Sequence, residues 1–321
     1  RLFNSDAFWD YWQQMALPAS YEQSVILHET RFTPYFAAKG YIWDTYVNTD
    51  DLCGVFVNPI MACPAELLQK RDCPFFKRRS LFTPYADELR RTDGCAAGEL
   101  YRYVKAHTEF PVDLLLASLL QTQPMAALAK NLHWNYVIAE PAAEVPDLAA
   151  LGLRLLRYTL PASDPVTDWY NKKASADADA LLGRAAQLFE KKSLLGVLSP
   201  ALPLWQGCAA ARRTQWQRDA EILAEKAAVP VGSDPLPAPN CGWLLVREAS
   251  FLDGIPPCTT QRDAWQLALT AQAAGYYAAA FETAAQAAAR ADVLDVYEAD
   301  AARPAAVAKH LGRLIKHKLQ K

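Results

Sequence analysis

The feature that most constrains the fold is an alternation of short apolar strands with helices in the later part of the chain. The predicted segments are, in order, a strand at Trp134–Ala139, a helix at Ala174–Lys192, a strand at Leu194–Leu198, a helix at Thr214–Ala228 and a strand at Gly242–Val246. Strands that alternate with helices at this spacing are typical of α/β layer architectures. The sequence therefore predicts an α/β protein.

The length of the chain and one proline-bearing segment suggest how it divides. Its 321 residues exceed the length at which single hydrophobic cores usually stop growing, so about two domains are expected. The segment Glu140–Asp147 contains prolines and shows little periodicity, which is typical of a linker. We therefore predict one domain over residues 1–139 and a second α/β domain over residues 140–321.

Charge, hydropathy and cysteine usage exclude several classes of protein. The net charge of −2 gives no indication of a nucleic-acid partner. No apolar run approaches the ~20 residues of a membrane span, so any membrane contact is expected to be peripheral. The seven cysteines include no CxxC pair, which argues against a disulfide framework and a zinc site. We expect a cytoplasmic protein in which Cys53, Cys63 and Cys73 are reduced and fill small spaces in the core or in loops.

The last segment of the chain, Ala305–Lys321, has the pattern of a basic amphipathic helix. Its apolar side chains, from Val307 to Leu319, form one stripe, and basic side chains flank it. Such a helix either docks on its own domain or lies on an anionic membrane surface. In the second interpretation, contact through this helix would place the protein at the inner face of the cell membrane.

Polar residues able to do chemistry are most concentrated between Tyr21 and Phe82. Ser20 and Gln23 predict a capping box that begins a helix, and Gly40 is a natural end for it. Inside this window Thr33-Pro34 predicts either a kink or a restart of the helix. A strand is predicted at Tyr41–Val47, and an acidic turn follows it.

A series of motifs in the first part of the chain gives it a family resemblance. They are FWDYW at Phe8–Trp12, SVILHE at Ser24–Glu29, NPIM at Asn58–Met61, CPFFKRRSLF at Cys73–Phe82 and NLHWNY at Asn131–Tyr136. In this order they resemble the rhamnan synthesis protein F family, bacterial glycosyltransferase-like proteins of rhamnose-containing surface polysaccharides. The resemblance is dense over residues 1 to 136 and faint beyond them.

The resemblance implies a partial GT-A-like glycosyltransferase domain. In the family, the segment before the first helix supplies the opening strands and an acidic motif near the donor, and this sequence does not contain that half. The implied activity is transfer of a sugar, rhamnose in the first instance, from a nucleotide sugar to a polysaccharide or lipid-linked acceptor. A non-catalytic carbohydrate-binding or assembly subunit of the same pathway is the alternative. In the later region, Trp243–Arg247 and Pro257–Arg262 depart from the family pattern.

The predicted catalytic residues are Glu29 and His28, because glycosyl transfer needs a base for the acceptor hydroxyl and either side chain can accept a proton near neutral pH. In the alternative interpretation Glu29 forms an ion pair with Arg31 or Arg1, and His28 caps or packs.

Lys77, Arg78 and Arg79 are the predicted diphosphate-binding residues. A guanidinium group matches phosphate oxygens with a planar fork, and a lysine supplies a point charge. In the strand-like run that follows Phe76, alternation would send Lys77 and Arg79 to one face and Arg78 to the other. The alternative is a solvated basic turn.

Asp44, Asp50 and Asp51 have the wrong spacing for a metal motif, and Asn48–Asp51 is interpreted as a turn or helix cap. No metal ligands are assigned, and Mg²⁺ or Mn²⁺ bound together with the nucleotide sugar stays open as a cofactor.

His133, Trp134 and Asn135 are the predicted sugar-binding residues, since this segment carries the side chains of a carbohydrate-stacking site. Alternate residues of a strand face opposite ways, so His133 acts with Asn135, or Trp134 with Tyr136. The alternative is a core tryptophan beside a hydrogen-bonded histidine.

Overall fold

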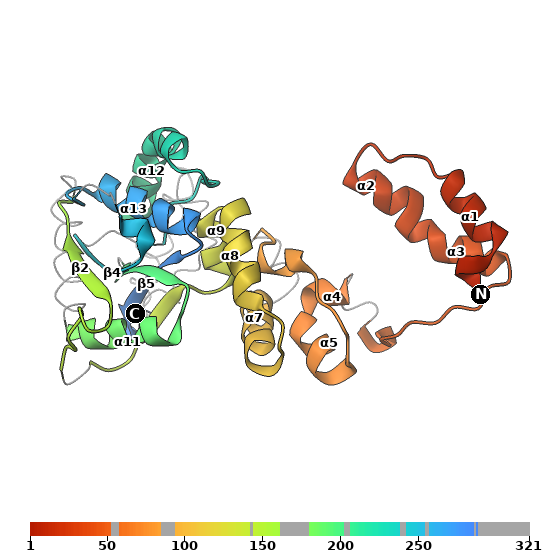
Figure 1. Cartoon of the computed structure of the whole chain (residues 1–321), viewed down its shortest axis with the longest axis horizontal. Coiled ribbons are helices and arrows are strands. Elements are labelled where there is room, and N and C mark those ends of the chain that lie inside the picture. Colours follow the sequence, from red (N-terminus) through yellow and green to blue (C-terminus); the bar gives the residue numbers. More distant parts are fainter. Residues whose placement is uncertain are drawn as a thin grey trace, which may run out of the picture.

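The computed structural model describes residues 1–52, 58–84, 94–141, 144–160, 180–201, 206–237, 242–253, 257–285 and 287. Within this part of the chain, Figure 1 shows three groups of elements. The first holds the helices α1 to α3, the second holds the helices α4 to α9, and the third is a sheet with its covering helices.

A five-stranded mixed sheet lies at the centre of the third group. Its strands are β1 (Asn135–Ile138), β2 (Leu153–Arg157), β3 (Leu195–Pro200), β4 (Trp243–Arg247) and β5 (Tyr277–Thr283). The spatial order is β1-β5-β3-β4-β2. β1, β5 and β3 are parallel, whereas β4 pairs antiparallel with both β3 and β2. The predicted α/β class is therefore confirmed, and the strands expected near residues 134, 194 and 242 are present.

Helices cover both faces of this sheet. α11 (Leu182–Lys191) lies on one face, and α13 (Gln261–Ala273) and α12 (Gln206–Lys226) lie on the other (Figure 1). All of β3 and nearly all of β5 are buried, as expected for strands covered on both sides. Gly196 is needed where β3 passes the end of α13, because a Cβ there would lie 2.7 Å from the Cβ of Tyr276.

The second group contains short helices that pack beside the sheet. They are α4 (Pro59–Ala62), α5 (Pro64–Arg71), the 3₁₀ turn η4 (Arg78–Leu81), α7 (Ala96–His107), α8 (Val112–Thr122) and α9 (Met125–Asn131). The Gln272 amide of α13 donates to the carbonyl oxygens of Leu120 and Gln123 at 2.7 and 2.9 Å, which ties α8 to the sheet.

The predicted division into residues 1–139 and 140–321 stays a prediction. The sheet nevertheless takes its first strand from residues before this boundary, since β1 pairs with β5.

The first group consists of α1 (Asp6–Gln13), α2 (Tyr21–Ser24), the π segment η2 (Val25–Glu29) and α3 (Thr30–Ala38). Ser5 caps α1 and Ser20 caps α2, each through its hydroxyl oxygen. The predicted restart at Thr33 is wrong, because α3 runs through Pro34. Pro34 has no backbone N–H, so one hydrogen bond of the helix is missing there. The π segment one turn earlier is the kind of irregularity that accommodates such a gap.

The strand predicted at Tyr41–Val47 is also wrong. This segment has no strand partner within the described part, and its side chains face solvent: Ile42 is 101 % exposed and Tyr46 is 81 % exposed. An alternating aromatic pattern does not make a strand without a neighbour for its backbone groups.

Two further observations concern the membrane and the thiols. Of the helices that the structure describes, none combines the length and the apolar character needed to cross a bilayer. Cys63 and Cys73 are free thiols, and Cys73 is buried, whereas Cys53 and the predicted helix Ala305–Lys321 lie outside the described ranges.

Candidate functional site

The two predicted catalytic residues lie on η2, in the first group of helices. A ring nitrogen of His28, Nε2, lies 2.8 Å from the carbonyl oxygen of Ala16, so the imidazole holds the loop between α1 and α2. Glu29 is exposed, and its carboxylate has no hydrogen bond or ion pair to any described residue. The structure therefore gives His28 a positioning contact and leaves Glu29 available to accept a proton.

The three predicted diphosphate-binding residues lie at η4. Lys77 directly precedes this 3₁₀ turn without a capping hydrogen bond from its side chain, and Arg78 and Arg79 are the first two residues of the turn. The prediction of a strand that alternates these side chains is wrong, because burial of Ser80 and Leu81 closes the chain into a turn. All three cations are exposed. The Arg78 guanidinium donates to the Thr122 hydroxyl at 3.1 Å, and none of the three forms an ion pair with a described carboxylate.

The three predicted sugar-binding residues lie at the start of β1 and make packing contacts. Trp134 is 4 % exposed and stacks on Tyr277, with 4.1 Å between ring centroids. His133 Nε2 lies 2.9 Å from the carbonyl oxygen of Gly94, and the Asn135 amide donates to the buried carboxylate of Glu282. A core tryptophan beside a hydrogen-bonded histidine is therefore what this segment forms.

The acidic turn is used for attachment. The backbone N–H of Asp50 donates to the Asn48 side chain at 2.8 Å, which is a turn contact. Arg71 on α5 forms a bidentate pair with Asp51, both N–O distances being 2.6 Å, and donates to the carbonyl oxygen of Asn48 at 2.8 Å. Because Arg71 donates to both carboxylate oxygens of Asp51, the pKa of Asp51 is lowered.

The predicted site residues do not converge on one place. η2 lies within the first group of helices, η4 within the second, and β1 at the edge of the sheet (Figure 1). η4 and the first group of helices are nevertheless within electrostatic reach of each other. Hydrogen bonds from its own backbone N–H and from Ser20 lower the pKa of Glu22 on α2, and the charge of Arg79 on η4 adds to them.

A polar cluster that the sequence analysis missed lies around Asp113 at the start of α8. The carboxylate accepts from the Tyr101 hydroxyl at 2.7 Å, from Lys105 Nζ at 2.8 and 3.0 Å, and from the Ser193 hydroxyl at 3.1 Å. Its hydrogen-bond donors come from α7 and from the loop before β3. No sequence motif could have indicated this cluster, since its members are up to 92 positions apart and Tyr101 reads as part of an apolar stripe on α7.

Lys192 and two tyrosines extend this cluster, here called the Asp113 cluster. Lys192 Nζ lies 5.9 Å from the centre of the Tyr136 ring, and the hydroxyls of Tyr136 and Tyr277 are 2.9 Å apart. Burial lowers the pKa of Lys192, and the nearby Lys105 and Arg102 lower it further. Burial raises the pKa of Tyr136 to about 12, so its hydroxyl keeps its proton at neutral pH.

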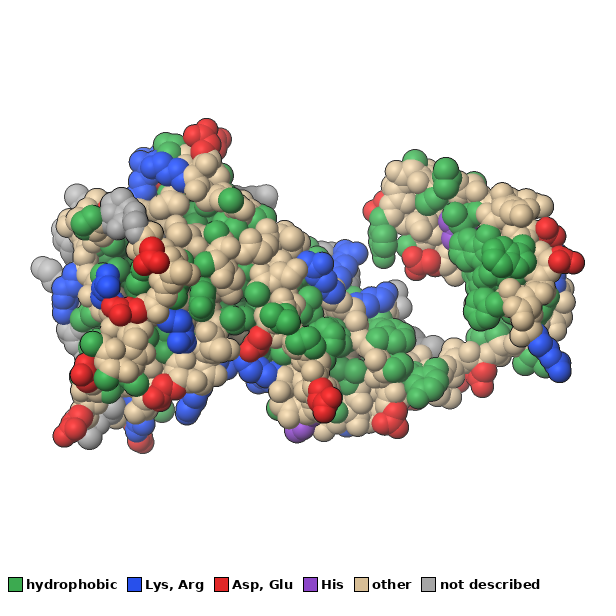
Figure 2. All heavy atoms as spheres, in the orientation of Figure 1, with side chains coloured by type: hydrophobic (Ala, Val, Ile, Leu, Met, Phe, Trp, Pro, Cys, Tyr) green, Lys and Arg blue, Asp and Glu red, His purple; other side chains and the backbone are tan. Residues whose placement is uncertain are grey.

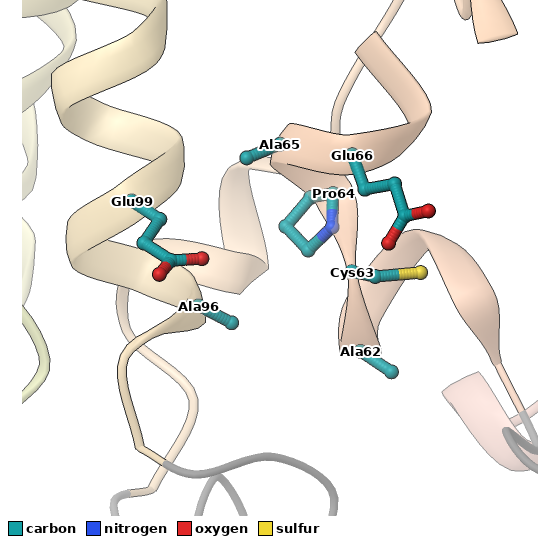
Figure 3. A pocket seen from close by; sticks show the side chains of 7 residues that line it. All are labelled: Ala62, Cys63, Pro64, Ala65, Glu66, Ala96 and Glu99. Atoms are coloured by element: carbon teal, nitrogen blue, oxygen red, sulfur yellow. The ribbon is translucent and has the colours of Figure 1, made fainter. Parts of the chain in front are cut away.

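A small pocket lies between α4, α5 and α7 (Figure 3). It is about 100 Å³ in volume, enough for a few water molecules. Its polar lining consists of Cys63, Glu66 and Glu99. Burial, with the negative charge of Glu66, raises the pKa of the Cys63 thiol, so this sulfur is not an activated nucleophile. Among the residues that the structure describes, no group of three side chains is arranged to hold a metal ion.

Apolar side chains gather on the surface of the first group of helices, where Figure 2 shows a broad green area. The aromatic side chains exposed on this group and on the segment after it are Phe3, Trp9, Trp12, Tyr21, Trp43 and Tyr46. Aromatic faces of this kind suit the apolar faces of sugar rings or another protein surface.

Together the elements define an α/β protein whose mixed sheet is extended by a layer of helices and by an aromatic helical unit. Residues 1–149 match the family model of rhamnan synthesis protein F, so the resemblance expected from the sequence is confirmed over that part of the chain. The match indicates a role in rhamnan polysaccharide synthesis. Neither a search of curated proteins nor a search of solved structures finds a match.

Proposed function

We propose that the protein is a glycosyltransferase of rhamnan polysaccharide synthesis. It moves a deoxyhexose such as rhamnose from a nucleotide sugar to a polysaccharide or lipid-linked acceptor, within a GT-A-like arrangement at the cytoplasmic side of the membrane. The observation that carries the proposal is the basic turn η4, where Lys77, Arg78 and Arg79 are all exposed and none of them pairs with a described carboxylate.

This basic turn suits the departing diphosphate. Transfer of the sugar leaves negative charge on the leaving group, and fixed cations stabilise that charge. The hydrogen bond of Arg78 to the Thr122 hydroxyl orients one guanidinium. Lys77 and Arg79 form no ion pair with a described carboxylate, although the charge of Arg79 reaches Glu22 on α2, and both can contact phosphate oxygens. Mg²⁺ or Mn²⁺ bound with the nucleotide would add to the same effect.

Glu29 is the proposed base. Its carboxylate is exposed and uncommitted, whereas one ring nitrogen of His28 is already engaged by Ala16. His28 then serves by positioning η2, and the proton of the acceptor hydroxyl passes to Glu29.

The test is a calorimetric titration of dTDP-rhamnose, with and without Mg²⁺ or Mn²⁺, into the full chain and into a Lys77→Ala/Arg78→Ala variant. Saturable binding that weakens at least about tenfold in the variant is expected, since charge-assisted contacts to phosphate contribute on the order of 1.5–3 kcal/mol each. The matched control is Arg218→Ala/Lys226→Ala, which removes the same charge from exposed positions on α12. Equal weakening in the control would mean that η4 is only a solvated basic turn.

The second candidate is a non-catalytic carbohydrate-binding or assembly subunit of the same pathway. The specific observation that favours it is the exposure of aromatic rings on the first group of helices and on the segment after it, with Trp9 58 % and Trp43 60 % exposed. If the folded chain binds rhamnan fragments but not dTDP-rhamnose, this second function replaces the first.

A further inference from the structure

The Asp113 cluster carries more positive charge than its carboxylate neutralises. Lys105 pairs with Asp113, and the charges of Lys105 and Arg102 both act unfavourably on Lys192. Asp113 is the one carboxylate, among the groups that the structure describes, that acts on Lys192. Three cations therefore face a single anion at this surface.

Asp113 has little capacity left for Lys192. Its oxygens already accept from Tyr101, Lys105 and Ser193. Lys192 is half-buried, and its ammonium has no hydrogen bond or ion pair with a described residue, only the face of the Tyr136 ring. An uncompensated cation in a partly buried position is costly unless an anion joins it.

The backbone that carries Lys192 is fixed in place. The Arg247 guanidinium donates to the carbonyl oxygens of Phe189, Lys192 and Leu195 at 2.7, 3.0 and 2.9 Å. On the other side, the Ser193 hydroxyl donates to Asp113. The backbone of Lys192 thus belongs to a rigid loop, which is the arrangement that a preorganised binding group requires.

The Tyr136 ring next to Lys192 carries a hydroxyl that is hydrogen-bonded to the Tyr277 hydroxyl. Tyr136 and Tyr277 share one hydrogen bond, and because each hydroxyl carries a proton, one of the two protons is left to donate elsewhere. Proteins commonly bind phosphate oxygens through cationic side chains with a hydroxyl donor nearby.

We propose that Arg102, Lys105 and Lys192 form a binding site for a phosphate-bearing ligand at the surface between α7, α8 and the loop before β3. The bound anion offsets the repulsion that Lys105 and Arg102 exert on Lys192, and the hydrogen bonds of Asp113 with Lys105 and Ser193 hold the site in position.

This site is distinct from the basic turn η4. Arg78 contacts Thr122 at the last turn of α8, whereas Asp113 lies in its first turn. Nine residues of helix separate them by about 13 Å, at the usual rise of ~1.5 Å per residue. The inference does not depend on the proposed transferase activity.

The experiment isolates this site by titrating pyrophosphate into the full chain with Lys77→Ala/Arg78→Ala already in place. On that background Lys192→Met removes the ammonium and keeps an apolar stem over Tyr136, while Lys192→Arg keeps the charge. The matched control is Lys191→Met, the exposed neighbouring residue at the end of α11. Orthophosphate, titrated in parallel, tells a diphosphate ligand from a monophosphate one.

We expect saturable binding on the background chain, weakened at least about tenfold by Lys192→Met and retained in Lys191→Met and Lys192→Arg. No binding of either anion to the folded background chain would overturn the proposal. Equal weakening in Lys191→Met would overturn it as well, because the effect would then reflect overall charge. Thermal unfolding verifies that each variant is folded, and Lys192→Gln, which also removes the ammonium group, takes the place of Lys192→Met if that variant is not folded.

Discussion

Arg247 ties the antiparallel edge of the sheet to α11. Its guanidinium meets carbonyl oxygens at the end of α11 and on β3, and it lies 5.4 Å from the centre of the Phe189 ring. Carbonyl groups at a helix end have no partner within the helix, so an arginine there satisfies them. From the sequence alone, Arg247 is only the last residue of a segment that departs from the family pattern.

At this scale we predict that Arg247→Met lowers the free energy of unfolding by about 2–4 kcal/mol, because partly buried carbonyl groups lose their donor. Urea denaturation followed by circular dichroism measures the change. The control is Arg154→Met, whose exposed pair with Glu248 at 2.9 Å is expected to contribute less than about 1 kcal/mol. Similar losses in both variants would contradict the role given to Arg247.

The first turn of α13 shows how one helix is started by its cap. The Thr260 hydroxyl accepts from the Asp263 N–H at 3.2 Å, and the Asp263 carboxylate accepts from the Thr260 N–H at 2.8 Å. Burial alone would raise the pKa of Asp263, but hydrogen bonds from Thr260 and Thr259 together lower it. The stability that Asp263 adds is therefore present above the ordinary carboxyl pKa and is lost as the pH falls through the lowered value.

We predict that Asp263→Asn costs about 1 kcal/mol of unfolding free energy at pH 7, and that this difference from the parent chain shrinks as the pH is lowered toward 3. Urea denaturation at a series of pH values measures it. The matched control is Asp253→Asn, at an exposed position. A constant difference at every pH would mean that the carboxylate charge of Asp263 is not involved.

Elements with strong periodicity could be predicted from the sequence, and elements that depend on a distant partner could not. α7, α8 and α9 follow from apolar spacing, and prolines directly precede α8 and α9. The segment Tyr41–Val47 has strand-like residues but no neighbouring strand in the described ranges, and η4 turns because Leu81 is buried. The Asp113 cluster exists only once α7, α8 and the loop before β3 have packed together, so local pattern carries no trace of it.

On the scale of the whole molecule, the first group of helices is attached through the acidic turn. Arg71 donates hydrogen bonds to both the carboxylate of Asp51 and the carbonyl oxygen of Asn48. We predict that Arg71→Ala increases the radius of gyration measured by small-angle X-ray scattering and leaves the thermal midpoint of the sheet unchanged, since the pair is remote from the strands.

The control for this variant is Lys70→Ala, because the Lys70 pair with Glu66, at 3.5 Å, stays within α5. An unchanged radius of gyration in Arg71→Ala, measured at the same concentration and ionic strength, would show that other contacts hold the first group of helices.

The order of the strands has a consequence for how the chain is made. Among the strands that the structure describes, β1, at residues 135–138, pairs with β5, at residues 277–283, and with no other. A ribosome that synthesises this chain from the N-terminus must therefore release more than a hundred further residues before β1 can be paired. Pairing between segments so far apart in the chain slows folding. α7, α8 and their neighbouring helices therefore stay partly exposed to solvent until the last strand is in place.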